Sequence, residues 1–201
     1  MSQVLDDLEL LEQWRAGDMR AGSQLLKRHF NALHRFFSSK TRGPAEDLIQ
    51  QTFVACVEAK DNFRGESSFR AYLFGLARMQ LYLHYRKNGR LSGFDFTTTS
   101  VLDLRPSATG ALMQRDEERL LQQALVRVPI DQQIALELTY WEELTAPEVA
   151  RVLGIPENTV YSRLRRAKEH LKTALEQLSD RPDHRESALR LLARQSEPSG
   201  R

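Results

Sequence analysis

The stretch TAPEVARVLGIPENTVYSRLRRAKEHL, residues 145–171, constrains the fold more than any other part of the chain. Thr145 and Glu148 stand at the two positions of a capping box, which predicts the start of a helix. Gly154 can adopt the left-handed conformation that ends this helix, and Pro156 can start the next one. The spacing predicts a helix-turn-helix whose second helix has one narrow apolar stripe. The stripe consists of Val160, Leu164, Ala167 and Leu171.

The second helix of this pair also carries an unusual share of positive charge. Residues 157–172 hold five basic and two acidic residues, whereas residues 116–156 hold three basic and eight acidic residues. Such a change of sign suits a surface that meets phosphate, and donors opposite the apolar stripe suit contact with the major groove. The alternative is an ordinary pair of surface helices with a solvated basic face.

Helical periodicity continues through the rest of the chain, and no run of alternating apolar residues predicts a strand. We expect an all-α fold in which two small helical domains, residues 1–88 and 113–178, are joined by a flexible linker at residues 89–112. The linker prediction depends on a TTTS run, scattered glycines and the lack of an amphipathic period. Residues 179–201 are expected to be a tail with one short amphipathic segment.

Charge and cysteine content narrow the possible classes of function. The net charge is +2, so binding to nucleic acid must depend on local patches. Cys56 is the single cysteine, which excludes an intrachain disulfide, and no Cys/His cluster has zinc-site spacing. The acidic N-terminus lacks a signal-peptide pattern, and no apolar run is long enough to span a bilayer. The sequence contains neither a phosphate loop nor a nucleophile motif that would indicate an enzyme. We expect a cytoplasmic, non-enzymatic protein without a metal or cofactor.

Three motifs in the first half of the chain add to the evidence from the helix-turn-helix. They are WRAGD (residues 14–18), AEDLIQQTF (residues 45–53) and FRGESSFRAYLFGLARMQLYLHYRK (residues 63–87). Together with LTAPEVARVLGIPENTVYSRLRRAKEHL (residues 144–171), they resemble the extracytoplasmic-function sigma factors of bacterial RNA polymerase. The resemblance covers about residues 10–175. It implies an alternative sigma factor that binds polymerase core and directs initiation at specific promoters. Family members are often held by an anti-sigma factor, and no residue here identifies one.

The resemblance also implies binding residues. Asp47, Gln50 and Gln51 match the face that contacts the clamp helices of the largest polymerase subunit, although a plain solvated face is the alternative. The loop at residues 64–68 corresponds to the loop that receives an extruded base of the −10 element. The implied −10 contacts are Arg64, Ser67, Ser68, Arg70, Phe74, Arg78, Tyr82, Tyr85 and Arg86. The implied −35 contacts are Asn158, Thr159, Ser162, Arg163, Arg165, Arg166 and Lys168.

Two alternatives stay open at this point. Aromatic residues at helical spacing lie more often in the protein interior than on a stacking surface, so Tyr82 and Tyr85 can be either, whereas Phe69, Tyr72 and Leu76 are expected in the interior.

The alternative function is a LuxR-type helix-turn-helix transcriptional regulator that does not bind polymerase core as a sigma subunit. Such a regulator usually carries a receiver or ligand domain, and the first half lacks the strand–helix alternation of a receiver.

Overall fold

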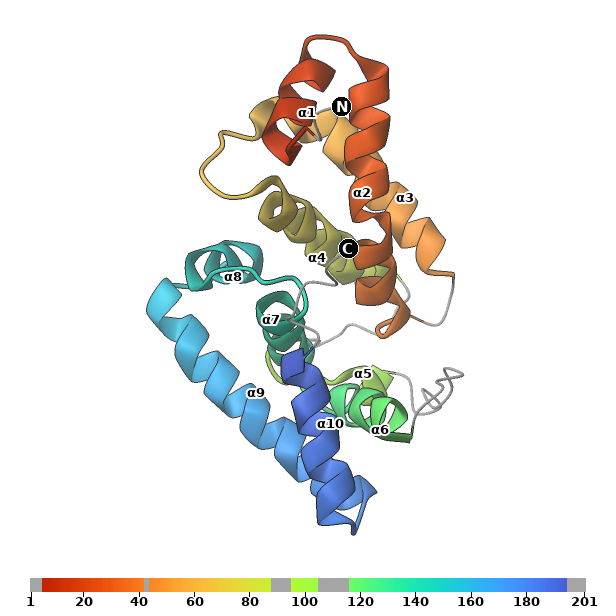
Figure 1. Ribbon diagram of the computed structural model, residues 1–201, viewed down its shortest axis with the longest axis vertical. Coiled ribbons are helices and arrows are strands. Elements are labelled where there is room, and N and C mark those ends of the chain that lie inside the picture. The colour runs from red at the N-terminus through yellow and green to blue at the C-terminus, as the bar shows by residue number, and fades with distance from the viewer. Residues whose placement is uncertain (1–4, 42–43, 88–94, 105–115, 195–201) are drawn as a thin grey trace. The chain divides into compact units, whose positions relative to one another are not determined.

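A computed structural model describes residues 5–41, 44–87, 95–104 and 116–194 of the chain (Figure 1). In these ranges the secondary structure is helical, apart from an isolated β-bridge between Ser100 and Pro129. The chain divides into two compact units, Met1–Arg86 and Lys87–Arg201. The predicted all-α, two-part fold is therefore confirmed.

The first unit is built around helices whose apolar faces turn inward. In chain order the elements are α1 (Asp7–Arg15), α2 (Met19–Ser38), α3 (Ala45–Ala59), the short 3-10 helix η1 (Lys60–Asn62) and α4 (Phe69–Lys87).

Helix α1 packs very closely on α2. A capping box starts α1, because the Asp6 carboxylate accepts from the Glu9 N–H at 2.8 Å and the Glu9 carboxylate accepts from the Asp6 N–H at 2.8 Å. The buried indole ring of Trp14 then lies over Gly22, where an added Cβ would come within 2.6 Å of the ring. A glycine at this position is what lets the two helices approach each other.

Helix α4 supplies the aromatic core of the first unit. Phe69 is buried, as predicted, and Phe74 packs edge-on against Phe36 of α2 with ring centroids 5.4 Å apart. Tyr72 is half-buried, and its hydroxyl donates to the Ala59 carbonyl at 2.8 Å. An aromatic contact therefore holds α4 against α2, and a hydrogen bond from Tyr72 holds it against the end of α3.

The second unit contains the predicted helix-turn-helix. Its elements are α5 (Val101–Leu104), α6 (Asp116–Leu125), α7 (Ile130–Tyr140), α8 (Ala146–Leu153), α9 (Glu157–Leu178) and α10 (Pro182–Arg194).

The described part of the predicted linker packs on this second unit. Phe96 and Val101 are buried, and the backbone N–H groups of Ile130 and Asp131 donate to the carbonyls of Thr99 and Phe96 at 2.9 and 3.0 Å. Residues 95–104 therefore belong to the unit structurally, and the rest of the predicted linker, residues 89–94 and 105–112, lies outside the described residues.

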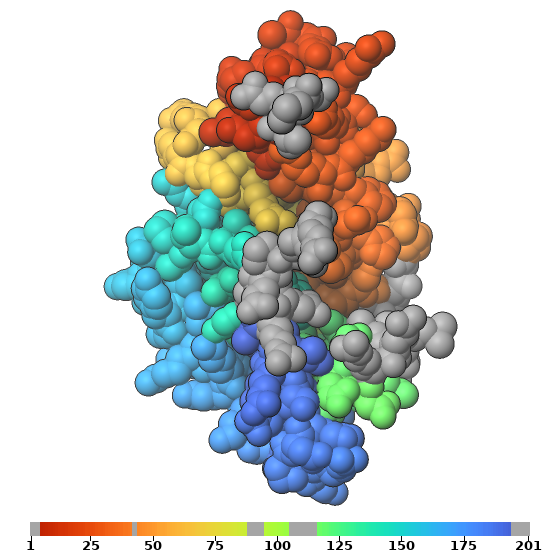
Figure 2. All heavy atoms as spheres, in the orientation of Figure 1, coloured from red at the N-terminus to blue at the C-terminus, as the bar shows by residue number. Residues whose placement is uncertain are grey.

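The predicted tail also contributes to the second unit. Its amphipathic segment is longer than expected and forms α10, which packs against α6 and α9 (Figure 2). Ala188 and Leu192 of α10 are buried in the same apolar cluster as Leu121, Leu171 and Leu175. The core that supports α9 thus extends beyond residue 178.

Candidate nucleic-acid interface

Local hydrogen bonds form both ends of α8 as predicted. The Glu148 carboxylate accepts from the N–H and the hydroxyl of Thr145 at 2.9 and 2.8 Å. Gly154 has a φ of 67°, in the left-handed region, and the N–H of Ile155 donates to the Ala150 carbonyl at 3.0 Å. These bonds confirm the predicted start and end of the first helix of the pair.

The apolar stripe of α9 is buried within its own unit. Val160, Ala167 and Leu171 have no exposed surface, and Leu164 is partly buried against the same core. Because α9 is long and amphipathic, burial of this stripe turns its opposite face to the solvent. The stripe was predicted from sequence and is confirmed.

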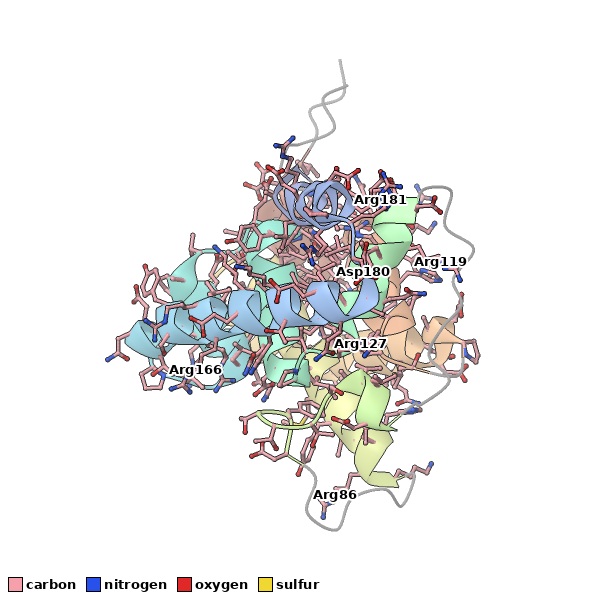
Figure 3. The ribbon with its side chains drawn as sticks, turned by 90° about the horizontal axis from the view of Figure 1, so that it is seen from below. Arg86, Arg119, Arg127, Arg166, Asp180 and Arg181 are labelled. Carbon is pink, nitrogen blue, oxygen red and sulfur yellow. The ribbon has the colours of Figure 1, made fainter. Side chains whose placement is uncertain are left out.

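The exposed face of α9 carries most of the predicted −35 residues. The Ser162 hydroxyl donates to the Thr159 carbonyl at 2.9 Å, and the Arg165 guanidinium lies 3.8 Å from the Glu169 carboxylate. Arg166 extends from α9 into solvent (Figure 3). Thr159 is half-buried, whereas the exposed members of the set are Asn158, Ser162, Arg165, Arg166 and Lys168.

Arg163 differs from the other members of the −35 set. Its Nη1 lies 2.9 Å from Asp131 Oδ2, and the two side chains are only 15% and 3% exposed. Asp131 belongs to α7, and its backbone N–H donates to the Phe96 carbonyl. Arg163 is therefore tied into the interior of its unit, and its contact with DNA stays a prediction.

The −10 residues divide into surface and core positions. Arg64, Ser68, Tyr82 and Arg86 are exposed, whereas Ser67, Arg70 and Arg78 are half-buried. Two aromatic residues of the predicted set lie in the core instead. Phe74 is buried against Phe36, and Tyr85 is buried with its hydroxyl donating to the Lys40 carbonyl, so neither ring offers a free face to a base.

The polar face of α3 is directed to solvent. Asp47, Gln50 and Gln51 are all exposed, and Val54 beside them is 51% exposed. On the opposite side of α3, Cys56 is fully buried, and burial raises the pKa of its thiol to about 12.

Comparison with known proteins connects both units to one family. Residues 24–91 match the model of Sigma-70 region 2, and residues 118–171 match the model of Sigma-70, region 4. The chain is 25% identical to the ECF RNA polymerase sigma-E factor of Salmonella typhimurium over 191 residues, covering 89% of this chain and 98% of the relative. It is 29% identical to the RNA polymerase sigma-H factor of Pseudomonas aeruginosa over 185 residues, covering 86% and 95%.

The chain is an extracytoplasmic-function sigma factor. It directs transcription initiation as a non-enzymatic subunit that binds RNA polymerase core and promoter DNA. This chain is similar in structure to the sigma factor RpoE from Bartonella quintana, which was solved in complex with the anti-sigma factor NepR. The two chains match with a TM-score of 0.58 and 29% sequence identity, and the match covers 79% of this chain and 98% of RpoE. The match to region 2 in the first unit decides against the LuxR-type regulator.

Some positioning residues of this sigma factor were not identified from sequence. Asp131 binds Arg163, and His170 Nδ1 lies 2.7 Å from Gln132 Oε1. Arg15 of α1 donates to main-chain carbonyls near the loop at residues 64–68. The spacing of these residues along the chain offers no signal, because each partner lies 32 or more positions away.

No described helix combines the length and apolarity that a membrane span requires.

Proposed function

We propose that this sigma factor recognises the −35 element with the exposed face of α9, in which Ser162, Arg165 and Arg166 meet base edges or adjacent phosphates. The observation that carries the proposal is the division of α9 into a buried apolar stripe and an exposed face of donors. An arginine can pair with both acceptors of guanine, which contributes about 1–3 kcal/mol of discrimination, whereas a phosphate contact adds affinity without sequence information. Asn158 and Thr159 line the same end of α9.

Competition binding of the full chain to single-base variants of its −35 element tests this assignment. We expect Arg166→Ala to relax the preference at one or two positions. Lys168→Ala is the matched control, since Lys168 is an exposed cation one turn from the proposed base contacts. Its loss should weaken binding to all variants and lower the salt slope by about 0.9. An equal loss on every variant with Arg166→Ala would contradict the base contact.

We further propose that the loop at residues 64–68 and the exposed side of α4 bind the −10 element. Arg64, Ser67 and Ser68 would contact the extruded base, while Arg70, Arg78 and Arg86 would hold the backbone. Tyr82 is 39% exposed and can stack on an unpaired base, which is worth about 1–3 kcal/mol.

Two substitutions of Tyr82 separate stacking from other effects. Tyr82→Phe keeps the ring and should open promoter DNA at nearly the normal rate in reconstituted holoenzyme. Tyr82→Ala removes the ring and should slow opening about tenfold or more. Opening is measured by fluorescence of a base analogue within the −10 element. If the two variants behave alike, Tyr82 does not stack on a base.

The polymerase clamp helices would bind the polar face of α3, formed by Asp47, Gln50 and Gln51. Since these side chains are exposed, the double variant Asp47→Ala/Gln50→Ala should lose affinity for core polymerase without losing thermal stability. Gln24→Ala, on the exposed side of α2, is the control. Normal capture of core polymerase by a stable double variant would remove this assignment.

The solved complex of RpoE with NepR supports a further partner class. We propose that this sigma factor is likewise held by an anti-sigma protein and acts in the cytoplasm, where polymerase core is found. Affinity purification from its native host should recover polymerase subunits together with one additional stoichiometric protein. Recovery of polymerase alone in both growing and stressed cells would argue against an anti-sigma factor, and recovery only from membranes would argue against the cytoplasm.

A further inference from the structure

Arg15 forms an unusual set of contacts at the C-terminal end of α1. Its Nη2 donates to the Lys60 and Phe63 carbonyls, each at 2.6 Å, and its Nε donates to the Lys60 carbonyl at 3.2 Å. The remaining nitrogen, Nη1, lies 2.7 Å from the Glu12 carboxylate. The side chain is 22% exposed. Hydrogen bonds from a charged donor are stronger than neutral ones, so the guanidinium holds two carbonyls three residues apart.

These two carbonyls belong to the first residue of η1 and to the residue that follows η1, just before the loop at residues 64–68. The Phe63 ring is buried, with its centroid 5.1 Å from the ring of Tyr72. On the far side of the loop, the Ser68 hydroxyl oxygen accepts from the Ala71 N–H at 3.2 Å and caps α4. The loop between these anchors is largely exposed, and Gly65 adopts a φ of 73°. The upstream anchor therefore combines the buried Phe63 ring, the bond from the Phe63 N–H to the Lys60 carbonyl at 3.4 Å and the bonds from Arg15.

Helix α1 is itself fixed to the first unit. Asp7 Oδ1 lies 2.6 Å from Arg28 Nη1, and Asp7 Oδ2 lies 2.6 Å from His29 Nε2. Trp14, next to Arg15, packs on Gly22. All of α1 precedes residue 24, where the match to region 2 begins. The contact from Arg15 thus comes from a helix outside the matched segment.

The geometry assigns to Arg15 the role of a positioning residue that fixes the conformation of the loop at residues 64–68 for the extruded −10 base. Binding of the Phe63 carbonyl sets the peptide plane between Phe63 and Arg64, and with it the direction in which the loop starts. This inference rests on the proposed assignment of the loop to the −10 element. Arg15 acts through the loop and does not touch DNA.

Amide hydrogen exchange of the free full chain tests the contact directly. In Arg15→Met, exchange at the start of the loop, measured at the Phe63 N–H that donates to the Lys60 carbonyl, should rise about tenfold or more, because the upstream anchor has lost its charge-assisted bonds. Arg15→Lys should give an intermediate rise, since one ammonium cannot reproduce the fork of the guanidinium. Arg20→Met, which removes an exposed arginine from the same unit, should leave the loop unchanged.

The effect on recognition of the −10 element is then measured in reconstituted holoenzyme. Arg15→Met should reduce discrimination among bases at one −10 position about fivefold or more, while −35 preference and affinity for core stay normal. Unchanged loop exchange, exchange that rises equally through α2 and α4, or local exchange with unchanged −10 discrimination would each overturn the inference. If Arg15→Met does not fold, Arg15→Lys is judged by the same criteria. If wild-type holoenzyme shows no −10 discrimination, the proposed function fails, and the exchange measurement still decides whether Arg15 holds the loop.

Discussion

Replacing Arg163 with Met tests whether the Arg163–Asp131 pair positions α9 rather than contacting DNA. The two charged groups lie 2.9 Å apart, and the Asp131 side chain is only 3% exposed. Removing one partner from a buried pair typically costs about 3–5 kcal/mol, because the other charge remains in the interior. We expect this cost for Arg163→Met. Asp131→Asn should cost less, about 1.5–3 kcal/mol, since the 15% exposed guanidinium can turn toward solvent.

Thermal unfolding of the full chain measures these costs. A loss of about 3 kcal/mol lowers the melting temperature of a 100-residue domain by about 12–24 °C. The double variant Arg163→Met/Asp131→Asn should lose less stability than the sum of the single variants, with a coupling of about 1 kcal/mol or more. The first unit should unfold at an unchanged temperature, because both residues belong to the second unit.

DNA binding at a temperature where Arg163→Met is folded gives an independent measurement. If Arg163 positions α9, the slope of the logarithm of affinity against the logarithm of salt concentration should stay unchanged. Lys168→Met should instead lower this slope by about 0.9, as expected for a lost phosphate contact. An unchanged melting temperature together with a lowered slope for Arg163→Met would refute the positioning role.

Other predictions concern the first unit. Gly22→Ala should destabilise this unit by about 1–3 kcal/mol, because the new Cβ would lie 2.6 Å from the indole ring of Trp14. The Cβ of Gly75→Ala would meet no atom within 4 Å, so this substitution should stabilise α4 by about 0.5–1 kcal/mol. Chemical denaturation measures both changes. Cys56 should react with iodoacetamide at pH 8 only after unfolding, since burial raises its pKa to about 12; rapid labelling of the folded chain would contradict this. Burial raises the pKa of Asp7, but hydrogen bonds and charges from His29 and Arg28 outweigh this effect and hold the pKa below its usual value. The stability that Asp7 contributes is therefore present above pH 3.8 and is lost as the pH falls through the lowered pKa, so Asp7→Asn should flatten the acid limb of the stability curve.

The sequence by itself determined the features that depend on residues a few positions apart. The capping box at Thr145, the left-handed turn at Gly154 and the apolar stripe of α9 all follow from local spacing, because helical periodicity and caps involve neighbours within about four residues. The order of motifs around residues 45–53 and 144–171 was enough to indicate the family. The resemblance also indicated the polar face of α3 at Asp47, Gln50 and Gln51, which are exposed.

The tertiary structure decided which side chains are available and which support them. Phe74 and Tyr85 share helical spacing with the exposed Tyr82, and only packing against α2 and the Lys40 carbonyl separates core from surface. Arg163 and Asp131 are 32 positions apart, and Arg15 reaches carbonyls 45 and 48 positions away. Every residue has a carbonyl, so composition cannot indicate which one an arginine will bind. Such contacts arise only when the chain has folded and brought distant segments together.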